Sequence, residues 1–238
     1  MKKIFFALFT SVLMIGGCMN SQTQISDNVA VSSASQQNAQ NAALTVTSRQ
    51  TPGQTAPSQQ QADPPQKTPA TNAQLAEPIS NALSRITKKT FGLKVSPGHS
   101  PVSPEKFSGY HTGVDFETTP DEQNIDVPIY AACDGKLLMK KIATGYGGVA
   151  VQSCTLNGAA VTIIYGHLKY TSIIPSVGQA LTAGEKIAVL GKGYSSETSG
   201  ERKHLHFGVH KGTGINILGY VQVASQLGNW LDGSKYMQ

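Results

Sequence analysis

His204-Leu205-His206-Phe207 is the stretch of sequence that decides the fold of this chain. Side chains at positions i and i+2 of an extended strand point to the same face. His204 and His206 can therefore face one point, while Leu205 and Phe207 face the opposite side. Alternation of metal-binding and apolar side chains predicts a strand that lines a site with one face and packs into the core with the other.

A second run, His111-Thr-Gly-Val-Asp115, shows the same alternation upstream. The spacing places His111 and Asp115 on one face, with Val114 and Phe116 on the other. Between the two runs, Tyr165-Gly-His167 adds a fourth imidazole. Catalytic zinc usually takes three protein ligands from His, Asp, Glu or Cys and leaves a fourth position for water. The set predicts a zinc hydrolase site in which two further histidines act on protons or on developing charge.

This combination resembles the lysostaphin-like (M23) family of zinc metallopeptidases. That family is marked by H-x-x-x-D, a later His in a Y-x-H-L-like run, and H-L-H-F. The corresponding runs here are His111-Thr-Gly-Val-Asp115, Tyr165-Gly-His167-Leu168 and His204-Leu-His-Phe207. The likeness extends from about Phe91 to about Tyr220, which is more than half of the chain.

Carried over position by position, the resemblance implies that His111, Asp115 and His206 bind Zn²⁺ and that His167 and His204 are the catalytic histidines. Their implied tasks are to activate the zinc-bound water, to stabilise the tetrahedral oxyanion and to protonate the leaving amine. The sequence does not divide the base and oxyanion roles between the two.

Two positions depart from the family pattern. Lys203 stands where the family often has Pro, and Gly208 stands where it often has Glu. Neither replaces a ligand or a catalytic histidine, so they bear on substrate preference more than on chemistry. Tyr146 and Tyr194 lie in loops that read either as groove walls or as plain turns.

Residues 1–17 read as a lipoprotein signal peptide. Met1-Lys2-Lys3 is basic, and the apolar stretch that follows is too short to span a bilayer comfortably. It ends in Ile15-Gly-Gly-Cys18, which resembles a bacterial lipobox, so we expect Cys18 to be lipidated. Met19 follows, with no Asp to favour inner-membrane retention. We therefore expect an outer-membrane lipoprotein that faces the periplasm of a Gram-negative cell.

The next segments are expected to connect this anchor to a folded domain. Residues 18–76 are rich in Gln, Ser, Thr, Ala, Asn and Pro, and such a composition predicts a disordered tether. Residues 77–90 carry Ile79, Leu83 and Ile86 at helical spacing, which predicts a short amphipathic helix. This helix would pack on the domain or cover its groove.

Residues 91–238 carry short apolar runs separated by Gly, Pro and Asp turns, with few helix signals. Asp134-Gly135 and Asn157-Gly158 are hairpin-turn signals. We predict one all-β domain, an antiparallel sandwich or half-barrel of the lysostaphin-like type, with a metal groove across one sheet. The expected strands cover 129–133, 136–140, 148–152, 160–165 and 186–190.

Cysteine and charge content narrow the functional classes. Cys133 and Cys154 remain after Cys18 is used by lipid, and they form either a disulfide or two buried thiols. The formal charge of +5 is concentrated upstream: residues 1–90 hold 7 Lys and Arg against 3 acids, and the remainder holds 12 against 11. A nearly neutral domain gives no argument for nucleic-acid binding.

The leading hypothesis is a zinc endopeptidase that cuts peptide cross-links in peptidoglycan, with stem peptides as the substrate and the membrane reached through Cys18. The alternative is a non-catalytic wall-bound regulator that activates an amidase, as degenerate family members do. The feature that separates them is the ligand set, which is complete here. A sugar-phosphotransfer domain fits poorly with export and with the His and Asp set. We expect a monomer, and a regulatory protein partner is left open.

Overall fold

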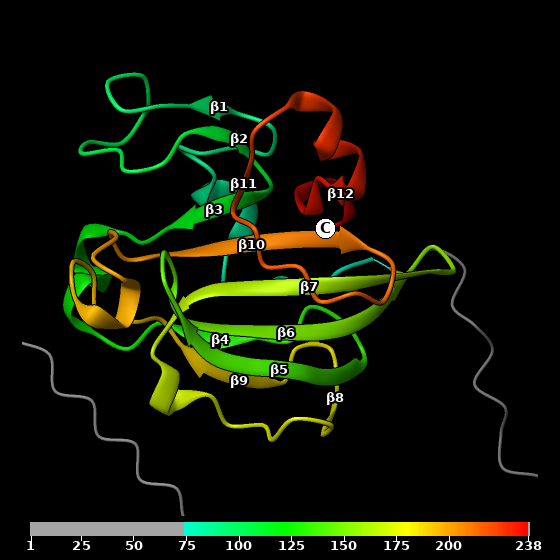
Figure 1. Ribbon diagram of the computed structural model, residues 1–238. Helices are drawn as coiled ribbons and strands as arrows, with labels where there is room; N and C mark the ends of the chain where they lie inside the picture. The colour runs from blue at the N-terminus through cyan, green and yellow to red at the C-terminus, as the bar shows by residue number, and fades with distance from the viewer. Residues whose placement is uncertain (1–73, 238) are drawn as a thin grey trace, which may run out of the picture. The chain divides into compact units, whose positions relative to one another are not determined.

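The computed structural model describes residues 74–237. The expected signal peptide, Cys18 and nearly all of the expected tether lie outside this range. Every pairing between named strands in the described range is antiparallel, and its only helices are six short 3-10 turns (Figure 1). The predicted antiparallel all-β class is therefore confirmed. No helix within residues 74–237 is long and apolar enough to cross a membrane.

Seven strands form the main sheet, in the order β12-β10-β7-β6-β5-β8, with β3 also paired to β10. Strand β10 lies at the junction: β3 and then β12 pair with one of its edges, and β7 pairs with the other. The bounds are β3 (Gly113–Glu117), β5 (Gly135–Ala143), β6 (Gly147–Leu156), β7 (Ala159–Leu168), β8 (Ala180–Leu181), β10 (His204–Lys211) and β12 (Trp230–Leu231).

Two smaller sheets flank the main one. A three-stranded sheet has the order β1-β2-β11, and a two-stranded sheet joins β4 to β9. Their strands are β1 (Lys94–Val95), β2 (Gly109–His111), β4 (Pro128–Tyr130), β9 (Lys186–Val189) and β11 (Tyr220–Val221). The 3-10 helices are η1 (Ala82–Arg85), η2 (Pro120–Asn124), η3 (Tyr170–Ser172), η4 (Ser196–Thr198), η5 (Ala224–Asn229) and η6 (Gly233–Tyr236).

One of the two predicted hairpin turns forms. Asn157 and Gly158 connect β6 to β7 and both have positive φ, 51° and 76°, as a tight hairpin turn requires. The other prediction is wrong, because β4 pairs with β9 and not with β5. Gly135 instead begins β5, where a Cβ atom would lie 1.8 Å from the Ser153 carbonyl oxygen. Its role is close backbone approach, which the dipeptide alone does not distinguish from a turn.

The main sheet buries apolar side chains on both faces. Leu205 and Phe207 of β10 lie in the larger core cluster together with Val114 and Phe116 of β3, which confirms the predicted alternation. A second cluster, on the other face of the strands, contains Tyr146, Val149, Val151, Ile164 and Trp230. In β10 the two faces differ, and a slip by one residue would move the histidines into the core and Leu205 and Phe207 out of it, so this strand's register is fixed.

The amphipathic helix predicted over residues 77–90 does not form. Only η1 is helical there, as a single 3-10 turn. Ile79 is buried, with 1% of its surface exposed, but Leu83 is 45% exposed, so the apolar spacing does not correspond to one buried helix face. Pro78 lies in a bend, and its carbonyl oxygen accepts a hydrogen bond from Tyr130 N. Contacts with the domain have overridden a weak local helix preference.

Cys133 and Cys154 form a disulfide, with 6.0 Å between their Cα atoms. Cys154 lies on β6, and Cys133 immediately precedes the neighbouring strand β5. The disulfide closes a loop with a sequence separation of 21 residues. In the chain-entropy account, a loop of this size stabilises the fold by about 3 kcal/mol.

Candidate metal centre

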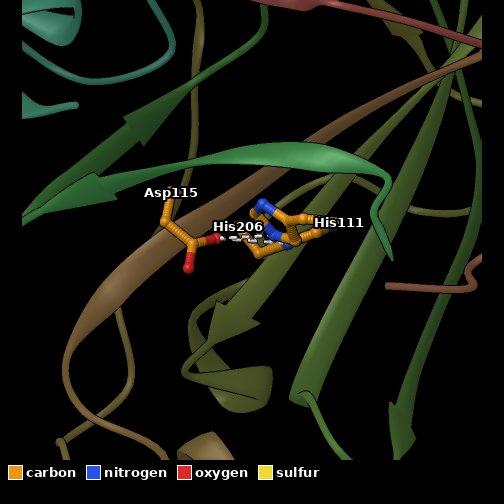
Figure 2. A group of neighbouring side chains, drawn as sticks. All are labelled: His111, Asp115 and His206. Carbon is orange, nitrogen blue, oxygen red and sulfur yellow. Dashed lines mark hydrogen bonds and ion pairs between the residues drawn. The ribbon is translucent and has the colours of Figure 1, made fainter. Parts of the chain in front are cut away.

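Three strands bring His111, Asp115 and His206 together. His111 ends β2, Asp115 lies in β3, and His206 lies directly opposite Asp115 in the β3–β10 register. Thr112 forms the single break between β2 and β3, and its backbone and hydroxyl both bond to the 218–219 loop. Figure 2 shows the three side chains pointing toward one another. All three are buried.

The three donor atoms form a nearly equilateral triangle. His111 Nε2 lies 3.0 Å from His206 Nδ1, and Asp115 Oδ1 lies 3.2 Å from each of these nitrogens (Figure 2). A tetrahedral zinc ion with bonds of about 2.0–2.1 Å would hold its ligand atoms about 3.3 Å apart. Two imidazole nitrogens and one carboxylate oxygen in this spacing fit zinc and leave its fourth position open.

Hydrogen bonds outside the triangle determine which nitrogen of His111 can bind a metal. His111 Nδ1 lies 3.1 Å from the Thr90 carbonyl oxygen, which can only accept, so Nδ1 carries the proton and Nε2 is the free donor. His206 would bind through Nδ1, because that atom faces the other two donors. Burial lowers the pKa of His206 to about 4, which keeps the imidazole neutral, as a metal ligand must be.

Arg202 binds the carboxylate oxygen of Asp115 that lies outside the donor triangle. Its Nη2 donates to Asp115 Oδ2 at 2.8 Å, and its Nε donates to both carboxylate oxygens of Glu117 at 3.0–3.1 Å. Asp115 Oδ1 is thereby left for the metal. Burial alone would raise the pKa of Asp115, but the His204 and His111 imidazoles hold it well below its ordinary value.

His167 enters the site through an irregularity in β7. The β6–β7 register passes from Gly166 opposite Val149 to Leu168 opposite Gly148, so His167 has no opposing residue. Its φ of 62° lies in the left-handed region, which is uncommon for a residue other than Gly. Strict alternation would place His167 on the core face with Tyr165. The bulge instead turns His167 to the pocket and returns Leu168 to the core.

His204 lies beside His167, with 4.3 Å between their ring centroids. Both rings are fixed in the same way: His167 Nδ1 donates to the Tyr146 carbonyl oxygen at 3.0 Å, and His204 Nδ1 donates to the Arg202 carbonyl oxygen at 2.9 Å. His167 Nε2 is left to exchange protons, and His204 Nε2 lies 3.3 Å from Asp115 Oδ2. Burial, reinforced by His204, holds the pKa of His167 well below its ordinary value, so His167 is neutral at pH 7.

These five residues surround one pocket of about 420 Å³, which Asp115, His167, His204 and His206 line directly. Tyr146, one of two candidate groove walls, lines the pocket, and its buried hydroxyl bonds to no described group. Tyr194, the other candidate, is 72% exposed and lies outside the pocket lining. A cluster on the pocket wall joins Lys89 to Glu105 at 2.7 Å and to the Tyr220 hydroxyl at 2.8 Å.

Sequence reasoning missed Arg202, Glu117 and the Lys89 cluster. A signal existed for Glu117, because it lies two residues after Asp115 and shares its face. No local pattern pointed to Lys89, whose partner Tyr220 lies 131 residues away. Lys203, one of the two departures noted above, donates to the carbonyl oxygens of Glu122 and Ile125.

Residues 109–217 match the model of peptidase family M23. This part of the chain belongs to that family. The matched range contains the two runs that carry His111, Asp115 and His206, and it contains His167 and His204. A search of curated proteins finds no match.

Several solved structures resemble the M23 domain. The structure of LytU is 27% identical, with 64% of this chain and 90% of that chain covered and a TM-score of 0.42. The catalytic domain of lysostaphin from Staphylococcus simulans is 21% identical, with 66% and 96% covered and a TM-score of 0.44. A zinc-containing peptidase from Vibrio cholerae is 25% identical, with 58% and 37% covered and a TM-score of 0.37.

Proposed function

We propose that the chain is a zinc-dependent endopeptidase that hydrolyses peptide cross-links of bacterial peptidoglycan. The observation that carries the proposal is the donor triangle of His111, Asp115 and His206 beside two further histidines in the same pocket. Membership in a peptidase family supports the reaction class. The substrate would be the stem peptides of the wall.

His111 Nε2, Asp115 Oδ1 and His206 Nδ1 would hold the zinc ion. When bound, zinc supplies Lewis-acid chemistry that polarises a carbonyl group and makes a water molecule acidic at neutral pH. Arg202 would keep Asp115 ionised and oriented, because its guanidinium group occupies the carboxylate oxygen that the triangle does not use.

His167 and His204 would move the protons of the reaction. Each ring carries its proton on Nδ1, where a backbone carbonyl group accepts it, so Nε2 is the atom that can take up a proton and later return one to the leaving amine. The depressed pKa of His167 keeps its Nε2 unprotonated at neutral pH. A protonated Nε2 would also stabilise negative charge on the attacked carbonyl oxygen.

Lipid attachment at Cys18 would place this activity at the outer membrane, facing the periplasm. The tether proposed for residues 18–76 would let the domain reach wall polymer at a distance from the lipid. For residues 1–73 both features rest on the sequence alone, since these residues lie outside those that the structure describes. The end of the expected tether was wrong: Leu75 is buried, and the backbone N–H groups of Leu75 and Ala76 donate to the carbonyl oxygens of Tyr236 and Ala132. A monomer without nucleic-acid partners completes the proposal.

The test is digestion of purified cross-linked peptidoglycan by the purified protein, with the released fragments analysed by mass spectrometry. We expect cross-link cleavage that a chelator abolishes and that His206→Ala removes. Zinc bound in full with no cleavage would contradict the enzyme and favour the alternative, a non-catalytic regulator of an amidase. An amidase activity assay with the added protein would then test that role.

A further inference from the structure

The wall of the pocket carries two cations that are already paired. Arg202 is held by Asp115 and Glu117, and Lys89 is held by Glu105 and by the Tyr220 hydroxyl. Their charges are compensated by carboxylates of the domain itself. Neither is therefore available as a strong binding group for an anionic part of a substrate.

Glu201, unlike these two cations, has a charge that its neighbours compensate poorly. It lines the same pocket, and its side chain is only 8% exposed. Its Oε1 is buried and accepts no hydrogen bond from the residues that the structure describes. Within residues 74–237 its one ionic contact is Lys106 Nζ at 3.1 Å. The Lys106 side chain is 47% exposed and also donates to the Gly200 carbonyl oxygen.

The backbone fixes the position of Glu201. Its N–H donates to the Thr198 carbonyl oxygen at 3.1 Å, and its own carbonyl oxygen accepts bonds from Tyr194 N at 2.6 Å and from the Thr198 hydroxyl at 2.7 Å. The carboxylate is thus presented by a rigid loop. Glu201 precedes His204 by three residues, so the two Cα atoms are at most about 11 Å apart.

A nearly buried carboxylate without hydrogen bonds is costly, and the group that compensates it best is a cation with several N–H donors. Lys106 compensates it only in part, because this lysine is half exposed to water and shares its ammonium group with the Gly200 carbonyl oxygen. An ammonium group entering the pocket would bring three donors to this carboxylate. The pocket therefore favours a substrate with positive charge close to its reactive end.

We propose that Glu201 is a specificity-determining residue that binds a free ammonium group of the peptide substrate. The short span to His204 places this group within one or two substrate residues of the scissile bond. The substrate class is a stem-peptide cross-link in which one diamino acid keeps an unlinked side-chain amine. The inference deepens the proposed function and rests on it for the identity of the pocket as the substrate site.

The test compares two synthetic cross-linked stem-peptide dimers that differ only in one side-chain amine, which is free in one and acetylated in the other. Binding is measured by calorimetry on the zinc-loaded full chain carrying His167→Ala, which blocks turnover. Cleavage of both dimers is measured on the chain with His167 intact. We expect the free amine to bind about 10-fold or more tightly, which is the range for a hydrogen bond to a charged group.

Three substitutions in the same background localise the effect. Glu201→Gln keeps the size of the side chain and should abolish the preference for the free amine. Glu197→Gln changes the same charge four residues away, outside the pocket lining, and should keep the preference. Lys106→Ala removes the competing cation and should increase it. Thermal melting and zinc content check that each variant is folded and loaded.

Binding and cleavage separate the two claims. Equal binding of the two dimers, or a preference that survives Glu201→Gln, would overturn the role of Glu201 whether or not either dimer is cut. A binding preference that Glu201→Gln removes, with no cleavage by the unsubstituted protein, would uphold the role of Glu201 and overturn the peptidase proposal. Should Glu201→Gln fail to fold, the dimer pair is compared on the protein with and without Lys106→Ala. A preference for the free amine that Lys106→Ala increases would uphold the role of Glu201, and equal binding or an unchanged preference would overturn it.

Discussion

Strands β10 and β7 both deliver histidines to the pocket, but in different ways. Strand β10 is regular, and its alternation alone places His204 and His206 on the pocket face with Leu205 in the core. Strand β7 alternates only as far as Gly166, where a bulge turns His167 out of the core face. Strand β10 follows its sequence pattern, and β7 departs from its pattern at His167, the residue proposed to transfer protons.

The difference indicates a division of labour. A regular strand paired on both edges gives His206 the fixed position that a metal ligand needs. The bulge places His167 where no regular β7 would, at the cost of a left-handed backbone conformation. Such a cost is tolerated where the surrounding structure holds the residue, and here the Tyr146 carbonyl oxygen fixes the ring.

The largest expected effect is the loss of zinc when the histidine of the regular strand β10 is removed. His206→Ala removes one corner of the donor triangle, so metal affinity should fall by more than about 100-fold, since even residues that only support ligands contribute about 10–100-fold. Cleavage should be lost with the metal. His210→Ala, on the same strand but packed on Trp230 outside the pocket, is the matched control. Metal analysis after dialysis distinguishes them, and equal zinc retention by both variants would contradict the assignment of His206.

The next largest expected effect is a loss of kcat when the histidine of the bulged strand β7 is removed. His167→Ala should retain zinc but lose about 10²–10⁴-fold in kcat, the range for a group that transfers a proton. His167→Gly should be equally inactive yet more stable than His167→Ala by about 1 kcal/mol, because Gly adopts the positive φ freely. Kinetics and chemical denaturation measure the two effects. Loss of zinc in His167→Ala would show that this residue serves the metal.

A smaller effect tests the two strands with the same substitution. At Gly166 a new Cβ would lie 2.4 Å from the Tyr146 ring, whereas at Gly208 of β10 it would meet nothing closer than 3.4 Å. Gly166→Ala should therefore destabilise the fold by about 1–3 kcal/mol through overpacking, and Gly208→Ala should stay within about 0.5 kcal/mol. Denaturant unfolding measures both, and equal stabilities would refute the close packing at Gly166.

The smallest effect concerns the support at the start of β10. Arg85 donates to both carboxylate oxygens of Glu122, at 2.6 and 2.8 Å, and the Glu122 carbonyl oxygen accepts from Lys203, the residue before His204. Hydrogen bonding to Arg85 lowers the pKa of Glu122 to about 2 from 4.5. The folded state thus favours the ionised carboxylate.

Stability from this pair is present above pH 4.5 and is lost as the pH falls toward 2. Glu122→Gln should cost about 1 kcal/mol at pH 7, and the difference from the unsubstituted protein should shrink between pH 4.5 and 2. Unfolding measured across that range checks it. Glu185→Gln removes the same charge from a carboxylate that accepts a hydrogen bond from Thr182 N, and it is the matched control.

The same contrast explains how far the sequence could be interpreted. Period-two alternation predicted the faces of β3 and β10 because it depends only on neighbouring residues. Alternation could not predict the bulge at His167, because the pairing of β7 with β6 sets the register there. The expected helix over 77–90 failed for a similar reason: Ile79 is buried by contacts with the domain, not by a helix face.

Charge pairs between residues far apart in the sequence could not be predicted either. Arg202 contacts Asp115 across 87 residues and Glu117 across 85, and no local spacing encodes either contact. Glu201, next in sequence to Arg202, contacts Lys106 from a different loop. The sequence could predict which residue types can hold a metal. Tertiary structure was needed to find the groups that orient them and the carboxylate that we propose selects a substrate.

The most direct test of the central claim is a crystal structure of the zinc-loaded protein with anomalous data collected at the zinc edge. The account predicts one zinc peak within about 2.0–2.2 Å of His111 Nε2, Asp115 Oδ1 and His206 Nδ1, with the Nε2 atoms of His167 and His204 facing the open fourth position. Zinc bound through His167 or His204 in place of one of these three, or no zinc peak in the pocket, would contradict it.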